Sequence, residues 1–163
     1  GGGFPLAAVV GRAELMRAYD PAAEADESFV PQVGTLSGNP VAAAAGLATL
    51  RVLQQDRDVY RRVRETGRTL RTALQRLLDE AEVPAHVTGE DVLFDAYFTD
   101  HPVTDYRSGL SDDKARLARF NQALFEQGIL KGGQKFYVSA CHTPEDVRYT
   151  IEAFRVAVER LRG

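Results

Sequence analysis

The 163-residue sequence has a single cysteine, one methionine and no tryptophan. One cysteine, Cys141, can make neither an intramolecular disulfide nor a cysteine-ligated zinc site, and it agrees with a reducing compartment. No apolar run approaches the roughly 20 residues of a membrane-spanning helix; the longest candidate, residues 41–50, is half that length and mostly alanine. No secretory signal is recognisable either. From these absences we expect a cytoplasmic protein that does not bind membranes.

Lysine and net positive charge are also scarce. The formal net charge is −3, which argues against a nucleic-acid partner, since such a partner favours a basic face. The lysines are Lys114, Lys131 and Lys135 alone, so chemistry that needs a lysine amine must use one of these or a lysine outside the sequence. The three histidines lie in separate segments without the spacing of metal ligands, so we expect no metal site. With 44% apolar residues, the chain can still build a globular core.

The first third of the chain contains too few predicted elements to close a core by itself. In order, these are a short strand over residues 6–10, a helix over residues 12–19, a loop over residues 20–33, and a helix from residue 41 to about residue 55. Asn39 is a good N-cap for the last helix and Pro40 a good first residue. The small residues of that helix, Ala42 to Gly46, allow another backbone to approach closely.

The remainder of the chain predicts a small, largely antiparallel sheet covered by helices. The expected elements are helices over residues 57–82 and 112–127, a final helix that begins at Thr143, and strands over residues 85–88, 92–99, 129–131 and 135–140. Gly89 is expected to join the first two strands. Asp56 is expected to cap the first helix, Gly128 to end the second and Thr143 to Asp146 to form a capping box. We therefore divide the chain into residues 1–55, the tail of a larger domain, and residues 56–163, a small α+β domain.

Apolar residues at regular spacing predict which faces are buried. On the helices they are Tyr60, Val63, Leu70, Leu74, Leu77 and Leu78; Leu117, Phe120, Leu124 and Phe125; and Val147, Ile151, Phe154, Val158 and Leu161. On the second strand they are Val92, Phe94, Ala96 and Phe98. Asp95 alternates with these strand residues and is either a buried carboxylate or part of a half-solvated sheet face. We favour the solvated face, because antiparallel sheets commonly have one.

Two other segments could carry chemistry. Cys141 and His142 are neighbours on an extended backbone and point to opposite sides, so they predict a packed thiol and a solvent-facing imidazole rather than a nucleophile–base pair. Residues 34–40 supply backbone N–H groups, two hydroxyls and a helix start, which are the parts of an anion cradle. The alternative is a capped helix start, which is common and which these residues favour when taken alone.

Three stretches of the sequence, Gly1–Arg12, Gly34–Leu50 and Ser139–Val147, resemble the class III aminotransferases, which use pyridoxal phosphate. The likeness is strongest to the glutamate-1-semialdehyde 2,1-aminomutases and their aminotransferase relatives. It implies the type I pyridoxal-phosphate transferase fold, an α/β class, here as the end of the large domain (residues 1–55) and the small C-terminal α+β domain (residues 56–163). It also implies a homodimer that acts on a small-molecule amino donor and acceptor.

The resemblance implies roles for few residues of this chain. Thr35, and with it Gly34, corresponds to the family position that contacts the cofactor phosphate of the neighbouring subunit. The Schiff-base lysine stands three positions before Gly1 in the family, so we expect no catalytic residue here and no activity of this chain alone. The sequence opens on glycines without an initiator methionine, and we accordingly expect it to be the C-terminal part of a longer protein.

One stretch departs from the aminomutase pattern. Aminomutases carry a longer segment with a Phe-Glu pair before the last strand, whereas residues 131–136 are shorter and contain no glutamate. The resemblance therefore implies a generic amino-group transferase more than an aminomutase. Two alternatives remain open: a decarboxylase or racemase on the same scaffold, and a small domain that dimerises without catalysis.

Overall fold

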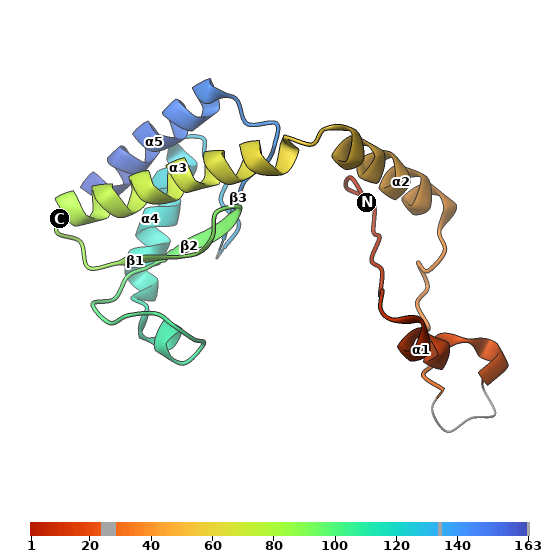
Figure 1. Ribbon diagram of the computed structural model, residues 1–163. Coiled ribbons are helices and arrows are strands. Elements are labelled where there is room, and N and C mark those ends of the chain that lie inside the picture. Colours follow the sequence, from red (N-terminus) through yellow and green to blue (C-terminus); the bar gives the residue numbers. More distant parts are fainter. Residues whose placement is uncertain (24–28, 134, 163) are drawn as a thin grey trace. The chain divides into compact units, whose positions relative to one another are not determined.

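The computed structural model describes residues 1–23, 29–133 and 135–162 (Figure 1). The chain forms two compact units, residues 1–57 and 58–163, and each is described by itself. None of the helices in the described ranges combines the length and apolar character that a bilayer crossing requires. Whether the first unit is the tail of a larger domain stays a prediction.

The first unit begins with an extended segment that does not become a strand. Residues 6–10, predicted as a buried strand, carry exposed side chains and form no strand. The reason is that no other strand lies beside them in the described part of this unit to take their backbone hydrogen bonds. The helix predicted over residues 12–19 is present as α1 (Ala13–Met16) followed by 3₁₀ turns over Arg17–Tyr19 and Pro21–Ala23. The predicted loop over 20–33 lies partly outside the described residues.

Helix α2 (Pro40–Gln55) confirms the local signals read from the sequence. Asn39 is the N-cap, and its Oδ1 accepts hydrogen bonds from the N–H groups of Val41 and Ala42, both at 3.0 Å. Gly46 is buried, and a Cβ built on it would overlap the side chain of Leu6. Gly46 therefore lets the Leu6 side chain pack closely against the helix, whereas the sequence predicted the approach of another backbone.

The second unit is a three-stranded antiparallel sheet covered by helices, as predicted. Its strands are β1 (His86–Glu90), β2 (Leu93–Tyr97) and β3 (Phe136–Tyr137), in that order across the sheet, and its long helices are α3 (Val59–Glu80), α4 (Lys114–Glu126) and α5 (Pro144–Glu159). Helix α5 packs against both α3 and α4 (Figure 1). A short 3₁₀ helix, η3 (Ser108–Ser111), precedes α4.

Aromatic rings join the sheet to two of the helices. Phe136 of β3 stacks on Phe94 at 5.0 Å and meets Phe154 of α5 edge-on at 5.4 Å, while Phe98 meets Phe120 of α4 at 5.4 Å. Rings at these separations add to the free energy of burial, so the rings tie β2, β3, α4 and α5 into one core.

Two helix residues of the second unit that were predicted to be buried are exposed instead. Tyr60 is 55% exposed and Phe125 is 64% exposed, whereas their neighbours Val59 and Leu124 are buried. Adjacent residues lie about 100° apart around a helix, so a face that buries Val59 and Leu124 turns the next residue toward solvent. Val147 and Ile151 of α5, also predicted inward, are partly buried.

Element boundaries differ from the prediction where they depend on tertiary contacts. Asp58, not Asp56, is the N-cap of α3, and Asp56 ends α2 instead. Gly89 lies within β1 opposite Phe94, with φ +112°, so residues 91–92 form the turn. Of the strands predicted over 129–131 and 135–140, only β3 forms, because β3 pairs with two residues of β2. Position 134 lies outside the described residues.

Helix ends with local capping signals agree with the prediction. Thr143 caps α5 in a capping box with Asp146: its Oγ1 accepts the Asp146 N–H, and Asp146 Oδ2 accepts the Thr143 N–H. Gly128 follows α4 with φ +77°, in the left-handed region that favours glycine. The last turn of α5 is followed by the buried Leu161.

Candidate functional site

The candidate anion site of the first unit is the turn before α2. The N–H of Ser37 donates to the Gly34 carbonyl at 3.0 Å, and the N–H of Asn39 donates to the Leu36 carbonyl at 3.2 Å, which gives two overlapping turns. Gly38 has φ +72°, which favours glycine at this position. Residues 34–38 are all exposed, so their donors can be reached from outside the unit.

The helix start behind this turn is already capped. Because Asn39 Oδ1 accepts from the first free N–H groups of α2, those donors are not available to an anion. The structure thus confirms the capped helix start, and any anion at this turn has to use the hydroxyls and N–H groups of the turn itself. The role of Thr35 and Gly34 toward a ligand stays a prediction.

A hollow of about 570 Å³ lies beside the turn within the first unit. Its lining is neutral throughout: Pro5, Leu6, Ala7, Gln32, Gly34, Thr35, Leu36, Ser37 and Gly38. Among the described residues, none donates to or accepts from the Thr35 hydroxyl. A Cβ built on Gly34 would lie 2.8 Å from Ser37 Oγ, so glycine keeps this side of the turn open. Two hydroxyls at a hollow whose described lining holds no carboxylate suit a phosphate group.

The three glycines at the start of the chain form a tight turn. The Phe4 N–H donates to the Gly1 carbonyl at 3.0 Å, and Gly2 and Gly3 have φ values of +58° and +99°. A Cβ on Gly1 would overlap the Phe4 carbonyl oxygen. Glycine is therefore required by the backbone here, whatever ligand the segment serves.

In the second unit, Asp95 is a buried carboxylate, so the predicted solvated face is wrong. Asp95 is 7% exposed, and its Oδ1 lies 2.9 Å from Lys131 Nζ and accepts the Ala96 N–H. Burial raises the pKa of Asp95 above its usual value, and Lys131 opposes that rise only in part. The solvated face was expected because the sheet itself does not cover Asp95. In the structure, Lys131 in the chain before β3 covers this carboxylate.

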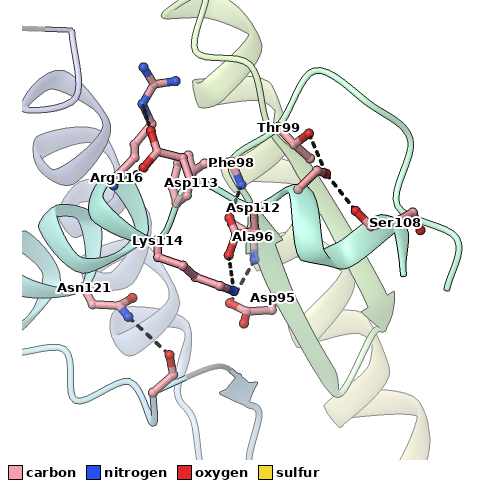
Figure 2. Close-up of polar contacts among 12 residues, drawn as sticks. Asp95, Ala96, Phe98, Thr99, Ser108, Asp112, Asp113, Lys114, Arg116 and Asn121 are labelled. Atoms are coloured by element: carbon pink, nitrogen blue, oxygen red, sulfur yellow. Dashed lines mark hydrogen bonds and ion pairs between the residues drawn. The ribbon is translucent and has the colours of Figure 1, made fainter. Parts of the chain in front are cut away.

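A second buried carboxylate lies beside Asp95 and was not foreseen from the sequence. Asp112 Oδ1 accepts the Phe98 N–H at 2.7 Å, and Asp112 Oδ2 accepts from Lys114 Nζ at 2.9 Å (Figure 2). Asp112 thus connects the end of β2 to the start of α4. The signal available in the sequence was the Asp-Asp-Lys run at 112–114, which reads equally well as an ordinary helix start.

Cys141 and His142 both lie in an exposed turn before α5, so the packed thiol predicted for Cys141 is wrong. The Ser139 N–H donates to His142 Nδ1 at 3.2 Å, and the Cys141 N–H donates to Ser139 Oγ at 3.1 Å. These bonds hold the turn and bring no thiol to the imidazole. Within the described ranges no cluster of metal-binding side chains occurs.

The three lysines differ in their access to a reagent or cofactor. The Lys131 side chain is 1% exposed and paired with Asp95, and its ammonium lies 5.1 Å from the centre of the Phe136 ring. Lys114 is paired with the buried Asp112, and Lys135 is exposed. The expectation that the reactive lysine lies outside this chain stays a prediction.

Comparison with known proteins gives a consistent family context. The family model described as Aminotransferase class-III matches residues 1–157. The chain is 38% identical to a glutamate-1-semialdehyde 2,1-aminomutase of Desulfitobacterium hafniense (strain DSM 10664 / DCB-2) and 39% identical to one of Thermomicrobium roseum, over 99% and 100% of its length. It spans 37% of the length of each of these relatives.

Solved structures show the same relationship in three dimensions. An omega-transaminase from Sphaerobacter thermophilus is 33% identical, with a TM-score of 0.86, over 100% of this chain and 37% of that chain. A transaminase with PLP bound shares the fold over 93% of this chain and 34% of that chain, with a TM-score of 0.74 and 23% identity.

Proposed function

The chain belongs to the class-III aminotransferase family, and on that premise we propose that it is the C-terminal portion of a pyridoxal-phosphate enzyme. The fold agrees, since the chain has the structure of the C-terminal part of the type I transferases. The proposed reaction moves an amino group between a small-molecule amino donor and a carbonyl compound. The single observation that carries the proposal is the family match over residues 1–157, which includes the neutral hydroxyl-bearing turn.

Thr35 and Gly34 are proposed to hold the phosphate group of the cofactor. The Thr35 hydroxyl donates a hydrogen bond to a phosphate oxygen, and Gly34 keeps the approach free of a side chain. When bound, pyridoxal phosphate supplies the carbonyl and the electron-withdrawing ring that amino transfer needs. The contribution of this chain is to bind and orient the phosphate end.

The intact enzyme is proposed to be a homodimer in which Thr35 serves the cofactor of the neighbouring subunit. The lysine that binds the cofactor is proposed to stand three positions before Gly1, with residues 1–55 as the end of the large domain and 56–163 as the small domain. This chain alone is then inactive. The cytoplasmic location expected from the sequence likewise remains a prediction.

Aminotransferase and aminomutase are both compatible with the family. The relatives at 38% and 39% identity are named as aminomutases, while the structure at TM-score 0.86 is an omega-transaminase. The short segment 131–136 without a glutamate favours the aminotransferase. A decarboxylase or racemase remains the second candidate, and product analysis of the full-length enzyme separates these four reactions.

The test of the phosphate role is the variant Thr35→Val in the full-length protein, since valine keeps the shape and removes the hydroxyl. A hydrogen bond from a hydroxyl to a charged phosphate contributes about 1.5–3 kcal/mol, so cofactor affinity should fall roughly ten- to a hundredfold. Because the Thr35 hydroxyl caps nothing among the described residues, melting of the cofactor-free protein should hardly change. A lower melting temperature with unchanged cofactor affinity would mean that Thr35 is structural.

A further inference from the structure

A second hydroxyl in the same turn, that of Ser37, also faces the hollow. Ser37 Oγ lies 2.8 Å from the position a Cβ would take on Gly34, while Ser37 Cβ lies 3.9 Å from it. The hydroxyl is therefore directed across the turn toward Gly34, on the side where Gly34 and Thr35 line the hollow. The Ser37 N–H is already used, since it donates to the Gly34 carbonyl and closes the turn.

Few hydrogen-bond donors and no positive charges line this hollow among the described residues. Asn39 occupies the first donors of α2, and no lysine or arginine lines the hollow within the described residues. The adjoining hollow, which Ser37 and Gln32 also line, is neutral as well. What the described lining of this hollow offers an anion is therefore a small number of neutral donors, so we expect each hydroxyl to carry a large share of the interaction.

We propose that Ser37 is a second hydroxyl donor to the cofactor phosphate, beside Thr35, and that Gly34 is glycine because any side chain there would displace the Ser37 hydroxyl. The inference rests on the proposed function, because it concerns the phosphate of that same cofactor. It assigns to one short turn two hydroxyls, two residues apart, on either side of Leu36.

The experiment uses the full-length protein and two probes, pyridoxal phosphate and pyridoxal, which differ only in the phosphate. Ser37→Ala should weaken binding of pyridoxal phosphate about tenfold and leave binding of pyridoxal unchanged. Ser37→Thr, which keeps a hydroxyl, should retain most of the affinity. Gly34→Ala should reproduce the loss, and adding Ser37→Ala to it should cause little further loss.

The matched control is Asn39→Ala, which removes the cap of α2 and leaves the hydroxyls in place. It should lower the melting temperature of the cofactor-free protein, whereas Ser37→Ala should not, and it should not weaken the preference for pyridoxal phosphate over pyridoxal, because the N–H groups that it frees can only add donors for the phosphate. If Ser37→Ala binds pyridoxal phosphate as tightly as wild type, or loses both probes equally, Ser37 is not a phosphate donor. If the wild-type protein binds neither probe, the proposed function itself fails.

Discussion

Asp95 and Lys131 place a carboxylate and an ammonium where water scarcely reaches either. Removing two charges from water costs several kcal/mol each, and their attraction repays this only with good geometry. Here the raised pKa of Asp95 shows that desolvation outweighs the contribution of Lys131. The pair therefore fixes where the chain before β3 lies more than it stabilises the fold.

Replacing one partner should be worse than replacing both. Asp95→Leu leaves a buried ammonium without a counter-charge and should lower the free energy of unfolding by about 3–5 kcal/mol. The double variant Asp95→Leu/Lys131→Met should recover this loss, with a free energy of unfolding between that of the wild type and about 4 kcal/mol above it. Denaturant titration of the four proteins measures the coupling. Additive effects of the two changes would contradict the buried pair.

The pH dependence of stability has a sign opposite to that of an ordinary paired aspartate. Because the native pKa of Asp95 lies above its unfolded value, the native state holds the proton more tightly, and stability falls as pH rises through the interval between the two values. Lys131→Met removes the group that lowers this pKa, so the interval should extend to higher pH. Melting temperatures of Lys131→Met and wild type, measured from acid to neutral pH, should diverge as pH rises; parallel curves would be the contrary result.

At the scale of elements, α3 holds the β1–β2 hairpin through its turn. Arg68 and Arg71 pair with Asp91 at 3.1 Å and 3.0 Å, and Gln75 Oε1 accepts the Val87 N–H at 2.7 Å. A Cβ on Gly67 would overlap the Asp91 carbonyl. The hairpin therefore approaches α3 as closely as a glycine permits.

Gly67→Ala should consequently destabilise the protein, although alanine is the better helix former. Helix propensity favours alanine by about 1 kcal/mol, but the backbone overlap requires the turn to move, and overpacking of this kind costs about 1–3 kcal/mol or more. We expect a net loss of roughly 1–3 kcal/mol in chemical denaturation. The control Thr72→Ala, at an exposed position of the same helix, should change stability by less than about 0.5 kcal/mol.

Helix starts could be predicted from the sequence because their determinants are local. Asn39 and Thr143 hydrogen-bond to N–H groups two or three residues away, so neighbouring residues suffice to locate the cap. The strands expected over residues 6–10, 129–131 and 135–140 could not be checked from local sequence, since a strand exists only where a partner strand lies beside it. The burial of Asp95 depends on Lys131, far along the chain, and no local pattern announces it.

At the scale of the whole molecule, the proposed site is shared between two subunits, and mixed dimers test this directly. One subunit carries Thr35→Val, and the other lacks the cofactor-binding lysine. If Thr35 serves the neighbour, the only competent lysine is in the Thr35→Val subunit and receives an intact threonine from its partner, so cofactor should bind with wild-type affinity. Affinity as weak as in the Thr35→Val homodimer would place Thr35 in its own subunit's site.

The candidate site itself was within reach of the sequence only through the family resemblance. Residues 34–38 alone indicate a capped helix start, which the structure confirms, and nothing local distinguishes Thr35 from any other exposed threonine. A site completed by residues of another part of the molecule leaves an incomplete pattern in each part. The direction of the Ser37 hydroxyl, in contrast, emerges only from coordinates.

The exposed turn before α5 bears on how such dimers are handled. Cys141, the one thiol of the chain, lies at the surface, where air oxidation can join it to the Cys141 of another copy. Such a crosslink would hold two copies together by a covalent bond unrelated to the packing of subunits. Two copies that migrate together without a reductant therefore show that a disulfide has formed. Association that persists in a reducing agent, or in Cys141→Ser, shows the quaternary structure.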